Sequence, residues 1–357
     1  MNEFDPNEAC APNGNFFGFP FSLEESHLVL IPVPWDVTTS YRKGASLGPK
    51  AILDASIQLD FFDFEIPNAW KGGIGTSPYE DSLPIKEISD FLRPVAERAI
   101  SYQEKKIQCL PVGYSQANYA KDISLVEKGS EKLNEWLKSK CSQYMNQGKK
   151  VGIVGGDHSV PLGFLQALAD NHEEFGILHL DAHADLRNAY EGFRYSHASI
   201  MNNVLQLDNV SRLVQVAIRD VCETEEELVA QSEGRIIQFT DMQLQKSLLE
   251  GHAWMDSCQQ IIASLPQKVY ISFDIDALDP SLCPHTGTPV PGGITFAQAR
   301  YLLSCLRQSG KEIIGFDLCE VAPNPHTPDD EWDGNVGSRL LYILANTLLF
   351  SCAVKSA

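Results

Sequence analysis

The chain has few basic residues for its length. Its 28 lysines and arginines stand against 47 aspartates and glutamates, which gives a formal net charge of −19. Nucleic acid and anionic lipid surfaces would repel such a chain. The charge therefore argues against nucleic acid and membranes as partners, whereas a small cationic substrate remains compatible with it.

Other features are missing as well. The nine cysteines include no CxxC pair, and their odd number and scattered spacing are typical of reduced thiols in a cytosolic protein. The N-terminus is acidic and lacks the basic region that begins a signal peptide. The longest largely apolar run, 340–354, is short for a membrane span and contains polar residues, so it predicts a buried C-terminal helix. We therefore expect a cytoplasmic protein.

No linker, internal repeat or low-complexity tract divides the chain, although 357 residues would allow about two domains. Short apolar runs alternate with helical patterns, which predicts βαβ units, a mostly parallel sheet and helices on both of its faces. Helices are expected at 49–56 and 125–147, and the segment 68–123, interrupted by proline and glycine, is a candidate insertion. The predicted strands are 27–33, 151–154, 176–180, 213–217, 235–239, 268–273 and 312–316.

Polar motifs follow three of these strands, and ligands of parallel sheets bind beyond the carboxyl ends of the strands. The first motif, GGDHS at 155–159, has two glycines that permit a sharp turn and then His158. Taken alone, a histidine in this place is more often a hydrogen-bonded structural residue than a metal ligand. This motif therefore predicts a function only in combination with the two motifs that follow other strands.

The second motif, DAHAD at 181–185, ends the predicted strand 176–180. Because side chains alternate along an extended chain, Asp181, His183 and Asp185 share one face. Two carboxylates and an imidazole crowded together are unstable without a cation. The alternation predicts a metal site rather than a solvated loop. His179, on the same face, is interpreted as a residue that supports the site or packs in the core.

The third motif, SFDIDALDP at 272–280, closes another apolar strand. Asp274 and Asp276 share a face there, which again calls for a metal ion. Asp279 fits a turn before Pro280 better and is expected to orient either the loop or one of the metal ligands.

Two histidines and four aspartates favour Mn²⁺ or another divalent first-row ion over a thiolate-bound metal. The four carboxylates balance the charge of two divalent cations, and such a site activates water for hydrolysis. The ligands are expected to be His158, Asp181, His183, Asp185, Asp274 and Asp276.

With these motifs in this order, the sequence resembles the arginase/agmatinase ureohydrolase family, in particular its agmatinase-like members. PVPWDVTTSYRKGASLGP at 32–49 and HTGTPVPGGIT at 285–295 extend the resemblance over about 28–349, with 68–123 matching poorly. It implies a three-layer α/β/α fold with a mostly parallel sheet. It also implies a single domain over 26–357, preceded by an N-terminal extension at 1–25, and a homotrimer or homohexamer.

The resemblance implies two divalent metal ions per subunit, Mn²⁺ by default and Ni²⁺ as an alternative. His158 and Asp185 would hold one ion. His183 and Asp276 would hold the other.

Asp181 and Asp274 would bridge the ions as part of the catalytic group, so that a metal-bridging hydroxide attacks the guanidino carbon and releases urea with ammonia or an amine. His197, in YSHAS, would transfer protons and contact the substrate. Glu320, in DLCE, would pair with the guanidinium. Ala198–Ser199 replaces the Gly-Thr of many agmatinases.

The substrate is expected to be a small guanidino cation, with guanidine first and agmatine next. Trp332 is a candidate for narrowing the substrate pocket. Phe16, Phe17, Phe19 and Phe21 are candidates too, although core packing is their commoner use.

Three alternatives stay open. Formimidoylglutamate hydrolysis on the same site would release formamide instead of urea. A catalytically inactive oligomeric regulator would not need the six ligands. A deacetylase-like amidohydrolase would use one metal ion rather than two.

Overall fold

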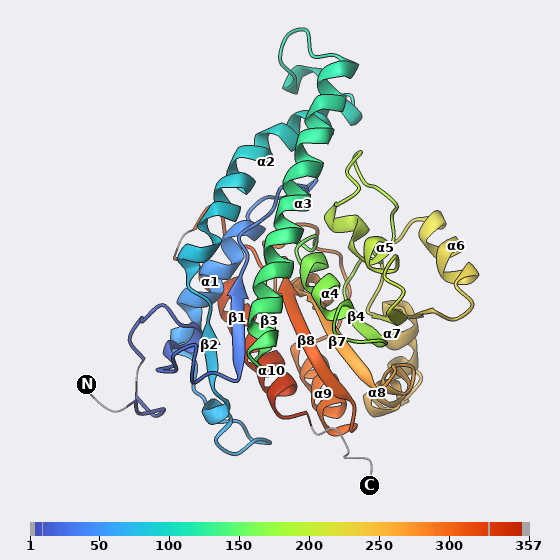
Figure 1. Ribbon diagram of the computed structural model, residues 1–357. Coiled ribbons are helices and arrows are strands. Elements are labelled where there is room, and N and C mark those ends of the chain that lie inside the picture. The colour runs from blue at the N-terminus through green and yellow to red at the C-terminus, as the bar shows by residue number, and fades with distance from the viewer. Residues whose placement is uncertain (1–3, 9, 328, 352–357) are drawn as a thin grey trace.

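The computed structural model describes residues 4–8, 10–327 and 329–351. Within this part of the chain, eight parallel strands form one sheet (Figure 1), in the order β2-β1-β3-β8-β7-β4-β5-β6. The strands are β1 (Leu28–Pro32), β2 (Ile74–Thr76), β3 (Lys150–Val154), β4 (Phe175–Leu180), β5 (Val210–Val216), β6 (Ile236–Phe239), β7 (Lys268–Asp274) and β8 (Glu312–Cys319).

All seven predicted strands are present, with ends that shift by up to three residues. The sequence prediction missed β2, which has only three residues, includes Gly75 and lies at the edge of the sheet. So short a strand has no alternation from which it could be predicted.

Helices cover both faces of the sheet. Side chains of β1 alternate between two cores: Leu28 and Leu30 pack with α1 and α8–α10, while Val29 and Ile31 pack with α2–α5. The three-layer α/β/α prediction is confirmed. The helices are α1 (Gly48–Ala55), α2 (Leu83–Gln103), α3 (Gln116–Asn146), α4 (Leu162–Ala169), α5 (Ile200–Val204), α6 (Glu223–Gln231), α7 (Asp241–Leu249), α8 (Trp254–Ala263), α9 (Phe296–Gln308) and α10 (Trp332–Leu349).

The poorly matched segment 68–123 forms β2, α2 and the first turns of α3. The predicted helix 125–147 starts nine residues too late, because α3 already begins at Gln116, after a capping box made by Ser115 and Asn118. The two helices pack together as a hairpin whose tip projects beyond the body of the molecule (Figure 1). The inner part of α2 nevertheless reaches the loop that follows β1.

The N-terminal phenylalanines belong to the core. Phe16, Phe17 and Phe19 are fully buried: Phe16 lies against Phe17, Phe17 lies against Tyr342, and Phe19 lies against Phe61 and Tyr342. Core packing is therefore the use that the structure assigns to these three side chains. They do not narrow the pocket described below.

The predicted C-terminal helix is present as α10. It begins at Trp332, eight residues before the apolar run, and most of its side chains from Leu340 onward are buried. None of the helices in the described part of the chain is both long and apolar enough to cross a membrane.

Candidate active site

The three polar motifs meet at one edge of the sheet. β7 pairs with β4 and β8, and β8 pairs with β3, so that the ends of β3, β4 and β7 lie close together. His158 reaches this edge because the chain turns sharply after β3. A Cβ atom on Gly156 would overlap the carbonyl group of Trp35, so only glycine fits there.

A first group of ligand atoms surrounds His158. Its Nδ1 lies 2.9 Å from Asp181 Oδ2, 3.2 Å from Asp185 Oδ2 and 3.4 Å from Asp274 Oδ2. All four side chains are buried. Donors around an ion at about 2.1 Å lie about 3 Å apart, so this group fits one divalent cation.

A second group surrounds His183. Its Nδ1 lies 3.1 Å from Asp276 Oδ2 and 3.4 Å from Asp181 Oδ1. Asp181 therefore presents one oxygen to each histidine, which is the geometry of a carboxylate shared by two ions. The structure brings all six predicted ligands together in this way.

The charges of the carboxylates explain why this cluster needs cations. Burial, together with the negative charges of Asp276 and Asp181, raises the pKa of Asp274 well above its usual value. Burial and the charge of Asp181 likewise raise the pKa of Asp185 to about 6. Two divalent ions would compensate this repulsion and allow every ligand to stay ionised.

Backbone amides fix the orientation of the carboxylates. Asp181 Oδ1 accepts a hydrogen bond from the His183 amide at 2.6 Å, and Asp274 Oδ1 accepts one from the Asp276 amide at 2.8 Å. Asp276 Oδ1 accepts one from the amide of Ala182 at 3.0 Å. In each case the other oxygen lies toward a histidine of the ligand groups.

Residues behind the ligands support them. His179 Nε2 lies 2.8 Å from Asp181 Oδ2, and its Nδ1 lies 2.9 Å from the Gln215 amide nitrogen. This agrees with the predicted supporting role of His179. Such outer partners hold metal ligands in place.

The sequence prediction assigned no role to Ser272 or Asp317. Ser272 Oγ lies 2.8 Å from His158 Nε2, and Asp317 Oδ1 lies 3.7 Å from the same nitrogen. The register pairs Ser272 of β7 with His179 of β4 and with Asp317 of β8, so the three form one row across the sheet. Ser272 lies two positions before the predicted ligand Asp274, which was the signal that could have identified it, whereas Asp317 precedes no predicted ligand by this spacing.

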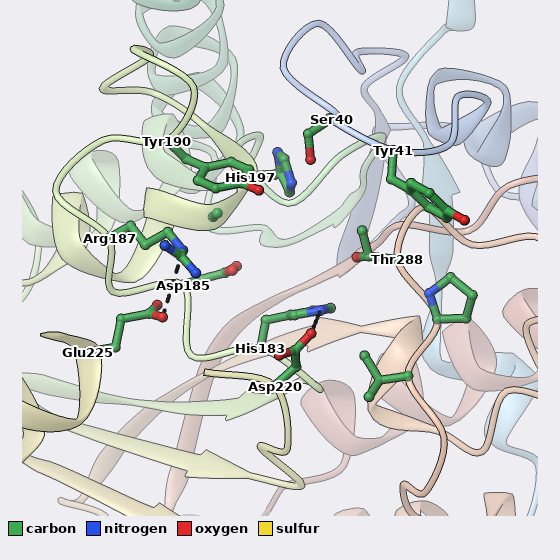
Figure 2. A pocket seen from close by; sticks show the side chains of 13 residues that line it. Ser40, Tyr41, His183, Asp185, Arg187, Tyr190, His197, Asp220, Glu225 and Thr288 are labelled. Atoms are coloured by element: carbon green, nitrogen blue, oxygen red, sulfur yellow. Dashed lines mark ion pairs between the residues drawn. The ribbon is translucent and has the colours of Figure 1, made fainter. Parts of the chain in front are cut away.

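A pocket of about 240 Å³ opens over His183 and Asp185 (Figure 2). Arg187 and Tyr190 lie on one side of it, and Tyr41 lies on the other. The lining residues are Ser40, Tyr41, His183, Asp185, Arg187, Tyr190, His197, Ala198, Asp220, Glu225, Thr288, Pro289 and Val290.

His197 lies in the pocket wall, as the prediction required. Its backbone N–H donates to Thr38 Oγ1 at 3.3 Å, and the edge of the ring faces Tyr190. Loss of hydration, with the positive charges of His183 and Arg93, lowers the pKa of His197 to about 3. The imidazole is therefore neutral near neutral pH.

Glu320 lies behind the wall rather than in it. Its Oε1 accepts a hydrogen bond from the His158 amide at 2.9 Å. Its buried Oε2 has no hydrogen-bond partner within the described residues and lies beside Gly287, next to the wall residue Thr288. An unpartnered buried carboxylate oxygen is costly unless a ligand supplies the missing donor.

Trp332 does not line this pocket. It begins α10, its side chain is half exposed, and its indole N–H donates to the carbonyl group of Ser281 at 2.9 Å. Asp279 accepts hydrogen bonds from the amide and hydroxyl groups of Ser281, as expected of a turn residue.

Comparison with known sequences agrees with this geometry. The sequence model of the arginase family matches residues 26–331. The chain belongs to the arginase family. Membership confirms the resemblance inferred from the motifs and the expectation of a hydrolase, and the His/Asp groups fit the binuclear centre that the family implies.

Relatives within the arginase family differ in their named substrates. N(1)-aminopropylagmatine ureohydrolase of Synechocystis sp. is 30% identical over 304 residues, which are 85% of this chain and 83% of the relative. Guanidinobutyrase of Pseudomonas aeruginosa is 26% identical over 332 residues, or 90% and 86% of the two chains.

A solved structure shows the same fold. Proclavaminate amidinohydrolase from Streptomyces clavuligerus superposes with a TM-score of 0.71 at 21% identity and covers 97% of this chain and 100% of its own.

Proposed function

We propose that this protein hydrolyses a C–N bond of a small guanidino compound at a binuclear metal centre and releases urea with ammonia or an amine. The observation that carries the proposal is Asp181, whose two oxygens face two separate histidine-centred groups at the base of a pocket. Relatives named as ureohydrolases support the same reaction class.

The six proposed ligands would hold two metal ions. His158 and Asp185 would hold one ion, His183 and Asp276 the other, and Asp181 would serve both, with Asp274 as the second shared carboxylate. Divalent ions in such a site activate water near neutral pH and stabilise negative charge on the reacting carbon's substituents. This chain's metal is proposed to be Mn²⁺, with Ni²⁺ as the alternative.

Glu320 is proposed to hold the guanidinium. A guanidinium can donate two parallel hydrogen bonds to a carboxylate, which fixes both its place and its orientation. In this role Glu320 Oε2, which lacks a partner in the protein, would receive one from the substrate, and the orientation would set the central carbon against the activated water.

Glu320→Gln should lower kcat/KM, with a loss of roughly 2–4 kcal/mol in transition-state stabilisation, because the amide keeps the shape of the side chain but removes its charge. Steady-state kinetics at full metal loading would measure this loss. Glu312→Gln, at the opposite end of the same strand, is the matched control and should leave kcat/KM unchanged. Equal kinetics for the two variants would remove Glu320 from the substrate site.

Guanidine is proposed as the preferred substrate, before agmatine. The pocket is small, and Arg187 places a positive charge in its wall. Arg187 Nε lies 3.8 Å from Glu225 Oε2, and both oxygens of Glu225 already accept hydrogen bonds from backbone N–H groups. The guanidinium of Arg187 therefore retains N–H donors and a positive charge that would repel the cationic tail of a substrate such as agmatine. Trp332 lies outside the wall of this pocket.

Arg187→Met should raise the ratio of kcat/KM for agmatine to that for guanidine by about tenfold, or about 1.4 kcal/mol. Arg194→Met is a matched control, because Arg194 also lies over a tyrosine ring but does not line the pocket. An unchanged ratio in Arg187→Met would show that Arg187 does not select against cationic tails.

A product assay separates the proposed function from its alternatives. Metal-loaded protein would be incubated with guanidine, agmatine, 4-guanidinobutyrate, arginine and formimidoylglutamate while urea, formamide and ammonia are measured. Urea from guanidine supports the proposal. Formamide alone identifies a formimidoylglutamate hydrolase, and no product from any substrate favours an inactive regulator. The cytoplasmic location and the homotrimer or homohexamer remain predictions.

A further inference from the structure

Helix α2 contacts the loop that leads from β1 into the active site. Arg93, in the middle of α2, donates from Nη1 to three carbonyl groups of that loop: Asp36 at 2.8 Å, Val37 at 3.2 Å and Thr39 at 2.8 Å. Only 13% of the Arg93 side chain is exposed. One nitrogen atom thus contacts three carbonyl groups within a stretch of four residues.

A second residue of α2 acts on the same loop. Ser89 lies one helical turn before Arg93, on the same face, and its Oγ accepts a hydrogen bond from the amide of Asp36 at 3.3 Å. The loop is therefore held by one donor and one acceptor from a helix whose segment matched the family motifs poorly.

This loop contacts the active site on its other side. Thr38 Oγ1 accepts the backbone N–H of His197 at 3.3 Å, and the Thr38 amide donates to Asp157 Oδ2 at 3.4 Å. Asp157 immediately precedes His158, one of the proposed metal ligands. Ser40, the residue that follows this loop, lines the pocket. A shift of the loop would therefore move the peptide that carries His197.

We propose that Arg93 is a positioning residue: it fixes the loop 36–39, and through Thr38 it sets the place of His197. The inference rests on the proposed hydrolysis, in which His197 would transfer a proton, as the family resemblance implies. Within the described part of the chain, Arg93 makes no hydrogen bond or ion pair with the proposed metal ligands. Its effect should therefore appear in turnover and not in metal binding.

Arg93→Met and Thr38→Val test this link from its two ends. Each should lower kcat by about tenfold or more, because small misplacements of a reacting group are costly. Metal content should stay at two ions per chain, and KM should change much less than kcat. Arg93→Lys should restore most of the turnover, since a single nitrogen with two N–H groups makes all three carbonyl contacts and an ammonium offers three donors.

A double-mutant cycle distinguishes positioning from general structural support. Arg93→Met and Thr38→Val would each be combined with His197→Ala. If Arg93 acts through His197, each added substitution should lower kcat by less than about twofold in the His197→Ala background. Arg98→Met is the matched control: Arg98 lies on the same helix but pairs with Asp122 of α3, so its loss should lower thermal stability and leave kcat unchanged.

The outcomes are separable. Wild-type protein that hydrolyses no guanidino compound overturns the proposed function itself. Wild-type hydrolysis with additive losses in the cycle overturns only the role of Arg93, and so does an Arg93→Lys variant that is as slow as Arg93→Met. If Arg93→Met fails to fold or to bind two ions, Thr38→Val in the same cycle decides: coupling to His197 supports the link, and additivity contradicts it.

Discussion

Asp181→Asn should nearly abolish activity, with a loss in kcat/KM of about 10³-fold or more, and should lower metal occupancy at the same time. Among the described residues, Asp181 is the side chain whose two oxygens reach both histidines of the candidate metal centre. The amide keeps the shape but removes the negative charge that both ions would share. Losing charge compensation in a buried binuclear site removes several kcal/mol of transition-state stabilisation.

Elemental analysis after reconstitution and desalting, together with urea release, measures both effects. Asp279→Asn is the control, because that aspartate lies five residues beyond Asp274 and serves only the turn at Ser281. Asp274→Asn should also lower occupancy. If Asp181→Asn kept two ions and normal turnover, the assignment of the shared ligand would be wrong.

His197→Ala should lower kcat by about 10²-fold or more while both metal ions stay bound, which is the usual scale for losing a general acid or base. The imidazole lies in the pocket wall and belongs to neither group of candidate metal-ligand atoms. Its pKa is lowered to about 3. It is therefore neutral across the neutral pH range.

Metal analysis and steady-state kinetics of the same preparation check this prediction. The exposed His252 provides the control substitution, His252→Ala, which should behave as wild type. Loss of a metal ion in His197→Ala would make His197 a ligand. Unchanged turnover would leave it with a structural role.

The candidate metal centre could be predicted from the sequence because the information for it is local. Each ligand motif directly follows a buried strand, so the period of the strand fixes which side chains share a face. Parallel strands then bring Asp181 and Asp274 to the same edge without any knowledge of the loops. The same reasoning predicted the sheet and both helical layers, apart from the short strand β2.

The pocket wall could not be predicted in the same way, because loops distant in sequence build it. Arg187 and Tyr41 meet across the pocket only after the chain has folded. Trp332 follows Glu320 closely in sequence, yet α10 carries its indole to Ser281 instead of to the wall. Arg93 lies in a segment without a recognisable motif, and only its tertiary contacts reveal it.

The most direct test of binuclear guanidino hydrolysis is a metal titration. Metal-free protein would be titrated with Mn²⁺, and in parallel with Ni²⁺, while urea release from guanidine and from agmatine is followed. Urea release should rise until two ions are bound per chain and then remain constant, as expected when both ions take part. Full activity at one ion per chain, or no urea from either substrate at any metal loading, would contradict binuclear hydrolysis of a guanidino compound.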